Sequence, residues 1–84
     1  MIAPTVKSML VMEGMKRNEA AAALGITAQA MSNKYNRDSF SADDLLKVAT
    51  AAGYNLAFVR KRDGLMIIFP SAGPAEGQDQ TKTE

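Results

Sequence analysis

The spacing of apolar residues changes from a helical period in the first two thirds of the chain to a strand period near its end. In the first part, apolar side chains recur every three or four residues, which is typical of helices that bury one face. From about residue 55 the sequence is rich in β-branched and aromatic residues, which favours strands. The pattern predicts four helices followed by one hairpin, a mainly α fold with a C-terminal β-hairpin (α+β).

The first two predicted helices each end at a glycine. A helix over 4–13 starts at Pro4, whose missing N–H would be unpaired at a first helical position in any case. Its apolar stripe consists of Val6, Met9, Leu10 and Met12. A second helix over 17–24 is rich in alanine, and its thin side chains let other helices approach closely. Lys16 is a poor N-cap there, although Glu19 is placed to accept a hydrogen bond from a backbone N–H.

The third and fourth predicted helices begin at good capping residues. Thr27 caps a helix over 28–35, and the turn that follows covers 36–39. Ser41 caps the fourth helix, with acids in its first turn that suit the helix dipole. This helix ends at Gly53, and its buried stripe consists of Leu45, Leu46, Val48, Ala49 and Ala52.

Two strands, 55–60 and 65–69, flank Asp63-Gly64, which is a strong short-range hairpin signal. With a two-residue turn at Asp63-Gly64, the predicted partners are Arg60 with Ile67, Val59 with Ile68, and Phe58 with Phe69. A three-residue loop would shift this register. Both faces of the hairpin are apolar in either case, and the helices of one small domain cover at most one of them. We therefore expect a second subunit to cover the rest.

The composition limits the possible functions. With 84 residues, the chain is one small domain at most, which we place at residues 1–70. Residues 71–84 lack large apolar side chains and are predicted to be a disordered tail, with or without a function. The chain contains no cysteine and no histidine, which excludes disulfides, the common zinc sites and a histidine-based catalytic triad. We expect no cofactor, no metal, no small-molecule ligand and no catalytic activity.

The location of charge permits a nucleic-acid partner without requiring one. Residues 71–84 carry three acids and one lysine, a net charge of −2, whereas residues 1–70 carry nine basic and six acidic residues, a net charge of +3. The part expected to fold is thus mildly basic. No apolar run is long enough for a membrane span, and no secretory signal is visible at the start. We expect a cytoplasmic protein.

The stretch from Arg17 to Tyr35 points to a function. Two short helices joined by Gly25-Ile26-Thr27 form a helix-turn-helix pattern, which also fits a hairpin of helices that only packs. Two observations favour DNA binding. The outward face of the third helix carries short, uncharged hydrogen-bonding residues, and cations or amides lie at the ends of the two helices where a DNA backbone would pass.

This stretch resembles the helix-turn-helix of lambdoid phage repressors, Cro proteins and XRE-type regulators. The resemblance extends from about Val6 to Gly53, and its most specific parts are Glu19, the turn at 25–27 and the run from Phe40 to Ala49. It implies a lambda-repressor-like four-helix domain whose third helix enters the major groove. The implied base-contacting residues are Ala28, Gln29, Ser32 and Asn33. The implied backbone-contacting residues are Lys16, Arg17, Thr27, Lys34, Asn36 and Arg37.

The chain departs from the family pattern at several positions. Ala28 replaces a polar residue that is frequent in relatives, and Lys16 replaces the usual hydroxyl or amide cap. Leu10 stands where some relatives carry a basic partner for the acid at Glu19. The hairpin takes the place of a fifth helix, so a dimer contact cannot be carried over from the family.

We interpret the chain as a transcriptional regulator of phage or mobile-element type, a repressor that binds a palindromic operator in double-stranded DNA as a homodimer. The expected dimer interface consists of Ala57, Val59, Met66, Ile67, Ile68 and Phe69. A monomer whose tail or loops cover the hairpin is the alternative assembly. The alternative function is a protein-interaction module, antitoxin-like or an anti-repressor, that uses the hairpin surface.

Overall fold

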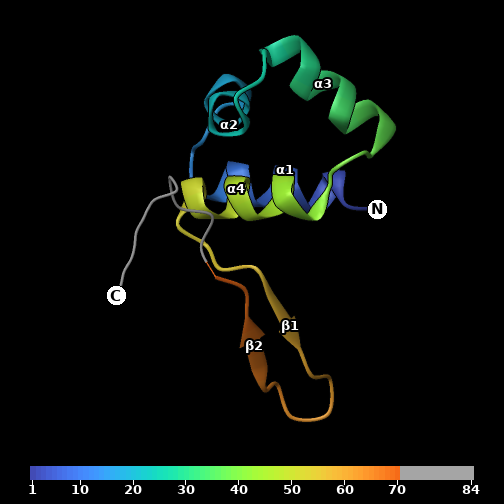
Figure 1. Ribbon diagram of the computed structural model, residues 1–84, viewed down its shortest axis with the longest axis vertical. Helices are drawn as coiled ribbons and strands as arrows, with labels where there is room; N and C mark the ends of the chain where they lie inside the picture. Colours follow the sequence, from blue (N-terminus) through green and yellow to red (C-terminus); the bar gives the residue numbers. More distant parts are fainter. Residues whose placement is uncertain (71–84) are drawn as a thin grey trace.

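The computed structural model describes residues 1–70. In chain order it contains α1 (Ala3–Met12), α2 (Arg17–Leu24), α3 (Ala28–Arg37), α4 (Ala42–Ala52), β1 (Ala57–Val59) and β2 (Met66–Ile68). Figure 1 shows the four helices grouped together and the two strands leading away from them. The predicted α+β class is confirmed, while the predicted tail at 71–84 lies outside the described residues. Within residues 1–70 no helix is long and apolar enough to cross a membrane.

The core lies where α2 packs against α3 and α4, and α1 packs against the same two helices. Ala20, Met31 and Val48 are at most 1% exposed. Because Ala20 presents only a methyl group, its helix can approach its neighbours closely. The four helices, residues 3–52, are called the helical body below.

The predicted core position at Met12 is wrong. Met12 is 76% exposed, whereas Ala3, Val6 and Leu10 are the buried residues of α1. These three follow the helical spacing of three and four residues, and Met12, only two residues after Leu10, points away from their face. The helix itself runs one residue earlier at each end than the predicted 4–13.

The boundary between α3 and the next turn also differs from the prediction. α3 continues to Arg37, two residues beyond the expected end at Tyr35, and Asp38 takes a left-handed conformation with φ of 53°. Aspartate tolerates this conformation better than most residues. Its carboxylate then reaches back to the start of α1, where it accepts hydrogen bonds from the backbone N–H groups of Ile2 at 2.9 Å and Ala3 at 2.6 Å. A side chain distant in sequence therefore caps α1.

The register predicted for a two-residue turn at Asp63-Gly64 is wrong. The observed partners are Ala57 with Ile68, Phe58 with Ile67, and Val59 with Met66. The loop covers 61–64, because the Arg60 N–H donates to the Leu65 carbonyl at 2.8 Å and the Gly64 N–H donates to the Arg60 carbonyl at 2.7 Å. The Asp63 carboxylate holds this wider loop by accepting from the Arg60 guanidinium at 2.8 and 3.0 Å.

The new register leaves the two faces of the hairpin with the same residues as the predicted pairing would. Moving each partner by two positions leaves every side chain on the same face, since the side-chain period of a strand is two. Phe58 and Ile67 lie on one face, and Val59 and Met66 on the other. All four are exposed, by 58 to 67%. The chain's own helices were expected to cover at most one face, and both faces are largely exposed, because the hairpin leads away from the body instead of folding back on it (Figure 1). Residues 55–69 are called the arm below.

Candidate DNA-binding surface

The turn between α2 and α3 is built around Gly25. Its φ of 72° is left-handed, a conformation that glycine adopts without strain. The N–H of Ile26 then donates to the Ala21 carbonyl at 3.0 Å, which closes α2 while the chain changes direction. Ile26 packs against the core. The turn thereby fixes α3 relative to α2, as the helix-turn-helix interpretation requires.

The start of α3 is set by Thr27. The Ala30 N–H donates to the Thr27 hydroxyl oxygen at 3.1 Å, so this hydroxyl is a helix cap, as predicted. Met31, fully buried, holds the opposite side of the helix in the core. α3 is therefore anchored at its first turn and along one face, while its other face is left toward solvent.

The outer face of α3 carries the predicted base-contacting residues. Gln29 and Asn33 are exposed, and Ala28 and Ser32 are half-buried. The Gln29 amide N–H donates to the Asn33 side-chain oxygen at 3.5 Å, a long contact between neighbouring side chains one turn apart on the helix. Amide side chains of this kind can pair with adenine through both their donor and their acceptor.

Asn36 lies on the helix and not in the turn that the sequence predicts. It is exposed, and it follows Ser32 by four residues and Asn33 by three, so it continues the same face by one turn. Arg37, the last residue of α3, is also exposed. The outer face of α3 is thus longer than the predicted helix allows.

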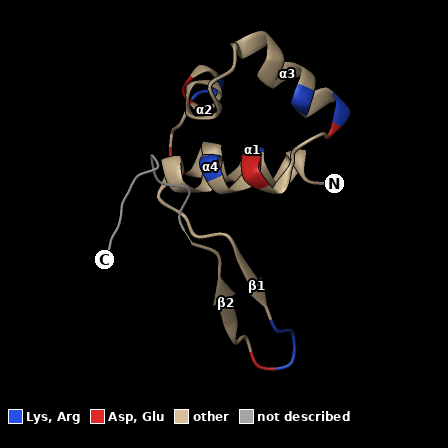
Figure 2. Ribbon diagram, viewed as in Figure 1, with Lys and Arg blue, Asp and Glu red and all other residues tan. Residues whose placement is uncertain are grey.

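The predicted backbone-contacting cations fall into two groups. Lys16 and Arg17 are exposed at the start of α2, where an anion is also favoured by the helix dipole. Lys34 differs, because its ammonium binds the Asp44 carboxylate of α4 at 2.8 Å and its side chain is only 26% exposed. Lys34 therefore links α3 to α4. Figure 2 shows Lys and Arg in the later turns of α3 and again in the loop of the arm.

Asp44 is held from several directions. Its N–H donates to the Ser41 hydroxyl at 3.0 Å, and its carboxylate accepts from the Ser41 N–H at 3.0 Å. Burial raises the pKa of this carboxyl, but the hydrogen bonds from Lys34 and Ser41 and the charge of Lys34 outweigh burial, so the pKa lies below its ordinary value. The charged form of Asp44 thus joins the start of α4 to the side of α3.

The sequence interpretation missed a contact between α1 and α3. The Lys7 ammonium lies 4.9 Å from the centre of the Tyr35 ring. Burial raises the pKa of the Tyr35 phenol, against the opposing effect of the positive charge of Arg17. The sequence treats Tyr35 only as an apolar helix position, and no spacing rule relates it to Lys7, which lies 28 residues earlier in the printed chain.

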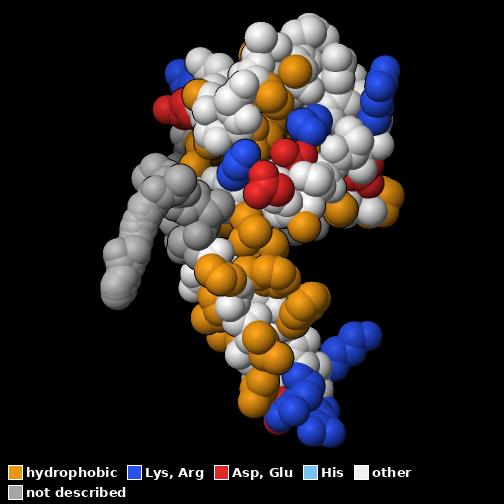
Figure 3. All heavy atoms as spheres, in the orientation of Figure 1, with side chains coloured by type: hydrophobic (Ala, Val, Ile, Leu, Met, Phe, Trp, Pro, Cys, Tyr) orange, Lys and Arg blue, Asp and Glu red, His pale blue; other side chains and the backbone are white. Residues whose placement is uncertain are grey.

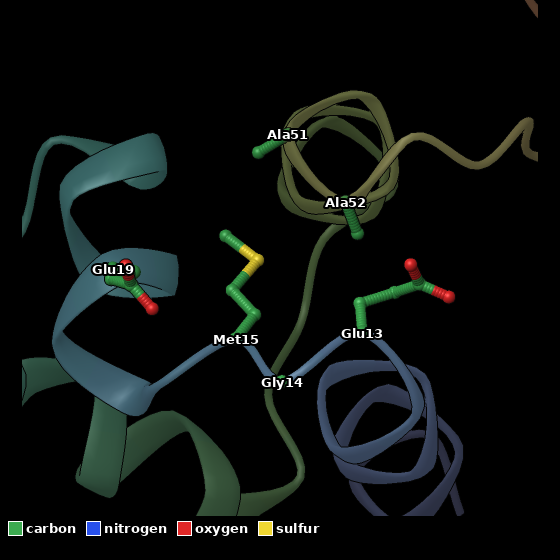
Figure 4. Close-up of a pocket in the computed structure, with 6 residues that line it drawn as sticks. All are labelled: Glu13, Gly14, Met15, Glu19, Ala51 and Ala52. Carbon is green, nitrogen blue, oxygen red and sulfur yellow. The ribbon is translucent and has the colours of Figure 1, made fainter.

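A cleft of about 310 Å³ between α1, α2 and α4 is a second candidate site, and two acidic residues line it. Figure 4 shows Met15 in its middle, with Glu13 and Glu19 on separate sides. Both carboxylates already accept hydrogen bonds, Glu19 from the Lys16 N–H at 2.7 Å and Glu13 from the Tyr54 hydroxyl at 2.9 Å. Among residues 1–70 there is no group of three or more His, Cys, Asp or Glu placed to hold a metal ion. The two acids serve as a helix cap and a tie to Tyr54.

The residues expected at the dimer interface lie on both faces of the arm. Ala57, Val59, Met66 and Ile68 share one face, and Ile67 and Phe69 lie on the other. Val59, Met66, Ile67 and Ile68 are at least 50% exposed, while Ala57 and Phe69 are half-buried. Figure 3 shows apolar side chains along the arm and continuing toward the helical body.

Comparison with protein-family models matches residues 5–67 to the bacteriophage CI repressor helix-turn-helix domain. The match includes the turn at Gly25, all of α3 and nearly all of the arm. Searches among curated proteins and among solved structures return no match. The family match agrees with the resemblance that the Arg17–Tyr35 stretch carries.

Proposed function

Because the chain belongs to the bacteriophage CI repressor helix-turn-helix family, we propose that it is a sequence-specific DNA-binding transcriptional regulator. It acts as a repressor by occupying a palindromic operator, and no catalytic step is required. α3 enters the major groove with Gln29, Ser32 and Asn33 toward the base edges and Ala28 in apolar contact. Lys16, Arg17, Asn36 and Arg37 contact the DNA backbone, while Thr27 holds the start of the helix.

The carrying observation is the exposure of Gln29 and Asn33 on a helix whose opposite face is fixed by fully buried Met31. A side chain can report base identity only if its helix does not rotate, because the donor and acceptor pattern of a base pair is read at fixed positions. A merely solvated helix face would more often carry Glu and Lys. The outer face of α3 instead carries neutral amides with cations around it.

The regulator acts as a homodimer through the arm. Large contiguous apolar surfaces are uncommon on monomers, and the arm exposes Phe58, Val59 and Ile67 by 58 to 67%. An isolated two-stranded hairpin is marginally stable in water, so a partner surface would also stabilise its strands. Two helix-turn-helix units bind half-sites about 34–36 Å apart, one turn of DNA. Analytical ultracentrifugation at tens of micromolar should give twice the 9.0 kDa chain mass, and a 9.0 kDa species would contradict the dimer.

A protein-interaction module is the second candidate function, and the same exposed arm favours it. Such a module predicts tight binding to another protein through the arm, together with weak DNA binding that is the same for every sequence. The net charge of residues 1–70, only +3, is compatible with this reading.

Selection of bound duplexes from a random pool separates the two candidates. The regulator predicts a palindromic consensus, and recovery of unrelated sequences would contradict it. Replacing Gln29 or Asn33 by alanine should relax the preference at one base pair and cost about 1–3 kcal/mol on the consensus site. Arg17→Ala is the matched control, because losing a phosphate contact weakens binding to all duplexes alike. Equal losses on consensus and random DNA for Gln29→Ala would remove the base-reading role.

A further inference from the structure

Lys7 of α1 contacts the Tyr35 ring near the end of α3, and Arg17 of α2 acts on Tyr35 through its charge. The Lys7 ammonium lies 4.9 Å from the centre of the Tyr35 ring, which restrains a side chain that would otherwise move freely in solvent. Arg17, at the start of α2, is close enough for its charge to act on the Tyr35 phenol. These three residues are called the Lys7 cluster below.

The cluster borders an open hollow of about 450 Å³, whose lining includes Lys7, Tyr35, Asn36 and Asp38. The Asp38 carboxylate is committed to the start of α1, where it accepts from the Ile2 and Ala3 N–H groups. Within the described residues Lys7 forms no ion pair with a carboxylate. The residues that line the hollow therefore include an ammonium, a phenol and the Asn36 amide. This donor set suits an anion with several oxygens.

We propose that the Lys7 cluster binds one phosphate of the DNA backbone next to the groove that α3 enters, with Lys7 and the Tyr35 hydroxyl as donors. This inference rests on the proposed function and extends the contact surface from α2 and α3 to α1. Tyr35 follows fully buried Met31 by four residues and Ser32 by three, so it lies between the core face of α3 and the edge that carries Ala28 and Ser32. A backbone running along this side of α3 would pass over the hollow. The Tyr35 ring positions the Lys7 ammonium, and the phosphate accepts hydrogen bonds from the N–H groups of that ammonium.

The test measures the salt dependence of binding to a fluorescein-labelled random-sequence duplex of about 30 base pairs, roughly three helical turns. A plot of log affinity against log salt has a negative slope. Lys7→Gln should make this slope less steep by about 0.9 per subunit, because one phosphate contact no longer releases a counterion. Lys7→Arg should restore the slope. Tyr35→Phe keeps the ring and loses only the hydroxyl, so affinity should fall about fivefold with an unchanged slope.

Lys47→Gln is the matched control, because it removes the same charge from a lysine on α4 that already pairs with Asp43 and lies outside the Lys7 cluster. A slope for Lys7→Gln equal to that of Lys47→Gln would overturn the inference. Thermal melting by circular dichroism verifies that each variant is folded, and Lys7→Met, which keeps the aliphatic contact with the ring, replaces Lys7→Gln if the latter melts early. The outcome is separate from the proposed function, which depends on base preference. A chain that selects a consensus but shows no Lys7 effect retains the function and loses this inference.

Discussion

The helical body and the arm use apolar residues in opposite ways. In the body, Met31 and Val48 are at most 1% exposed, whereas Phe58 and Ile67 in the arm are exposed by 67 and 64%. Figure 3 shows the contrast as an arm lined with apolar side chains below a body whose surface is largely polar. Hydrophobic sequence alone does not produce a core. A core forms where the topology brings apolar faces together, and two short strands leading away from the body have no such face to meet.

The difference indicates that the folded structure of the body and that of the arm are stabilised by different contacts. The body buries its apolar faces within one chain, so its stability is a property of the monomer. The exposed apolar faces of the arm gain from burial only when another surface arrives, at about 25 cal/mol per Å² of apolar area. The body is therefore suited to hold α3 in place, and the arm is the region whose order depends on a partner surface, as the proposed dimer would supply.

The largest expected effect is a cavity in the body. Met31→Ala should lower the free energy of unfolding by about 2–5 kcal/mol, because it removes a fully buried side chain from the contact between α2 and α3. Met12→Ala is the control, since Met12 is 76% exposed and its loss should change stability by less than about 0.5 kcal/mol. Urea unfolding followed by circular dichroism measures both. Similar losses for the two variants would mean that the body lacks the core described here.

The next effect concerns the arm. Val59→Lys should weaken the proposed dimer by about a hundredfold or more, because that dimer would bury two valines at about 1.5–3 kcal/mol each. The unfolding of the helical body should be unchanged. Val11→Lys on α1 is the matched control, because Val11 is 79% exposed and lies outside the arm. Sedimentation should show dissociation for Val59→Lys alone, and a dimer that survives this change would assign the interface to another surface.

The body was more predictable from the sequence than the arm, because helices depend mainly on neighbouring residues. The caps at Thr27 and Ser41, the end at Gly25 and the boundaries of α2 all follow from residue types at short spacing. The cap of α1 by Asp38 does not, because a contact between residues 35 or 36 positions apart leaves no local signal. The loop of the arm was mispredicted because Arg60 binds Asp63 and favours a wider turn than Asp-Gly alone indicates.

The residue types of the candidate site were predictable from the sequence. Which of these side chains are already held by contacts within the protein was not. The amides on the outer face of α3 are visible from a helical projection of the sequence. That Lys34 is held by Asp44, and that Lys7 lies over Tyr35, depends on how α1 and α4 pack against α3. Such contacts require the folded chain, since residues on three different helices must first be brought together.

A smaller change in stability is expected from the loss of an ion pair in the body, and an ion pair in the arm serves as the comparison. Asp44→Asn should lower the free energy of unfolding by about 1 kcal/mol at neutral pH through the loss of the half-buried contact with Lys34. Because folding lowers the pKa of Asp44, its contribution is present above the ordinary value of 3.8 and is lost as the pH falls from there through the folded pKa. Urea unfolding at a series of pH values gives the free energy of unfolding of the parent chain and of Asp44→Asn. The two values should converge in that acid range.

Asp63→Asn in the arm is the control for this measurement. Arg60 lowers the pKa of Asp63 through a hydrogen bond, but this pair is exposed and lies at the loop of the arm. The unfolding of the body should therefore be unaffected at every pH. A pH-dependent effect of Asp63→Asn on the body would show that the arm and the body do not unfold independently.

The smallest effect lies at the junction, where Tyr54 follows α4 and precedes the arm. Its hydroxyl donates to the Glu13 carboxylate at 2.9 Å, and this hydrogen bond raises the pKa of the Tyr54 phenol. In a Tyr35→Phe background, where Tyr54 is the remaining tyrosine, Glu13→Gln should move the phenol titration down toward its ordinary value of 10.0. Ultraviolet absorbance of the phenolate measures the shift. An unchanged titration would mean that Glu13 does not tie Tyr54 to the body, so that the junction between Gly53 and the arm is free to reorient.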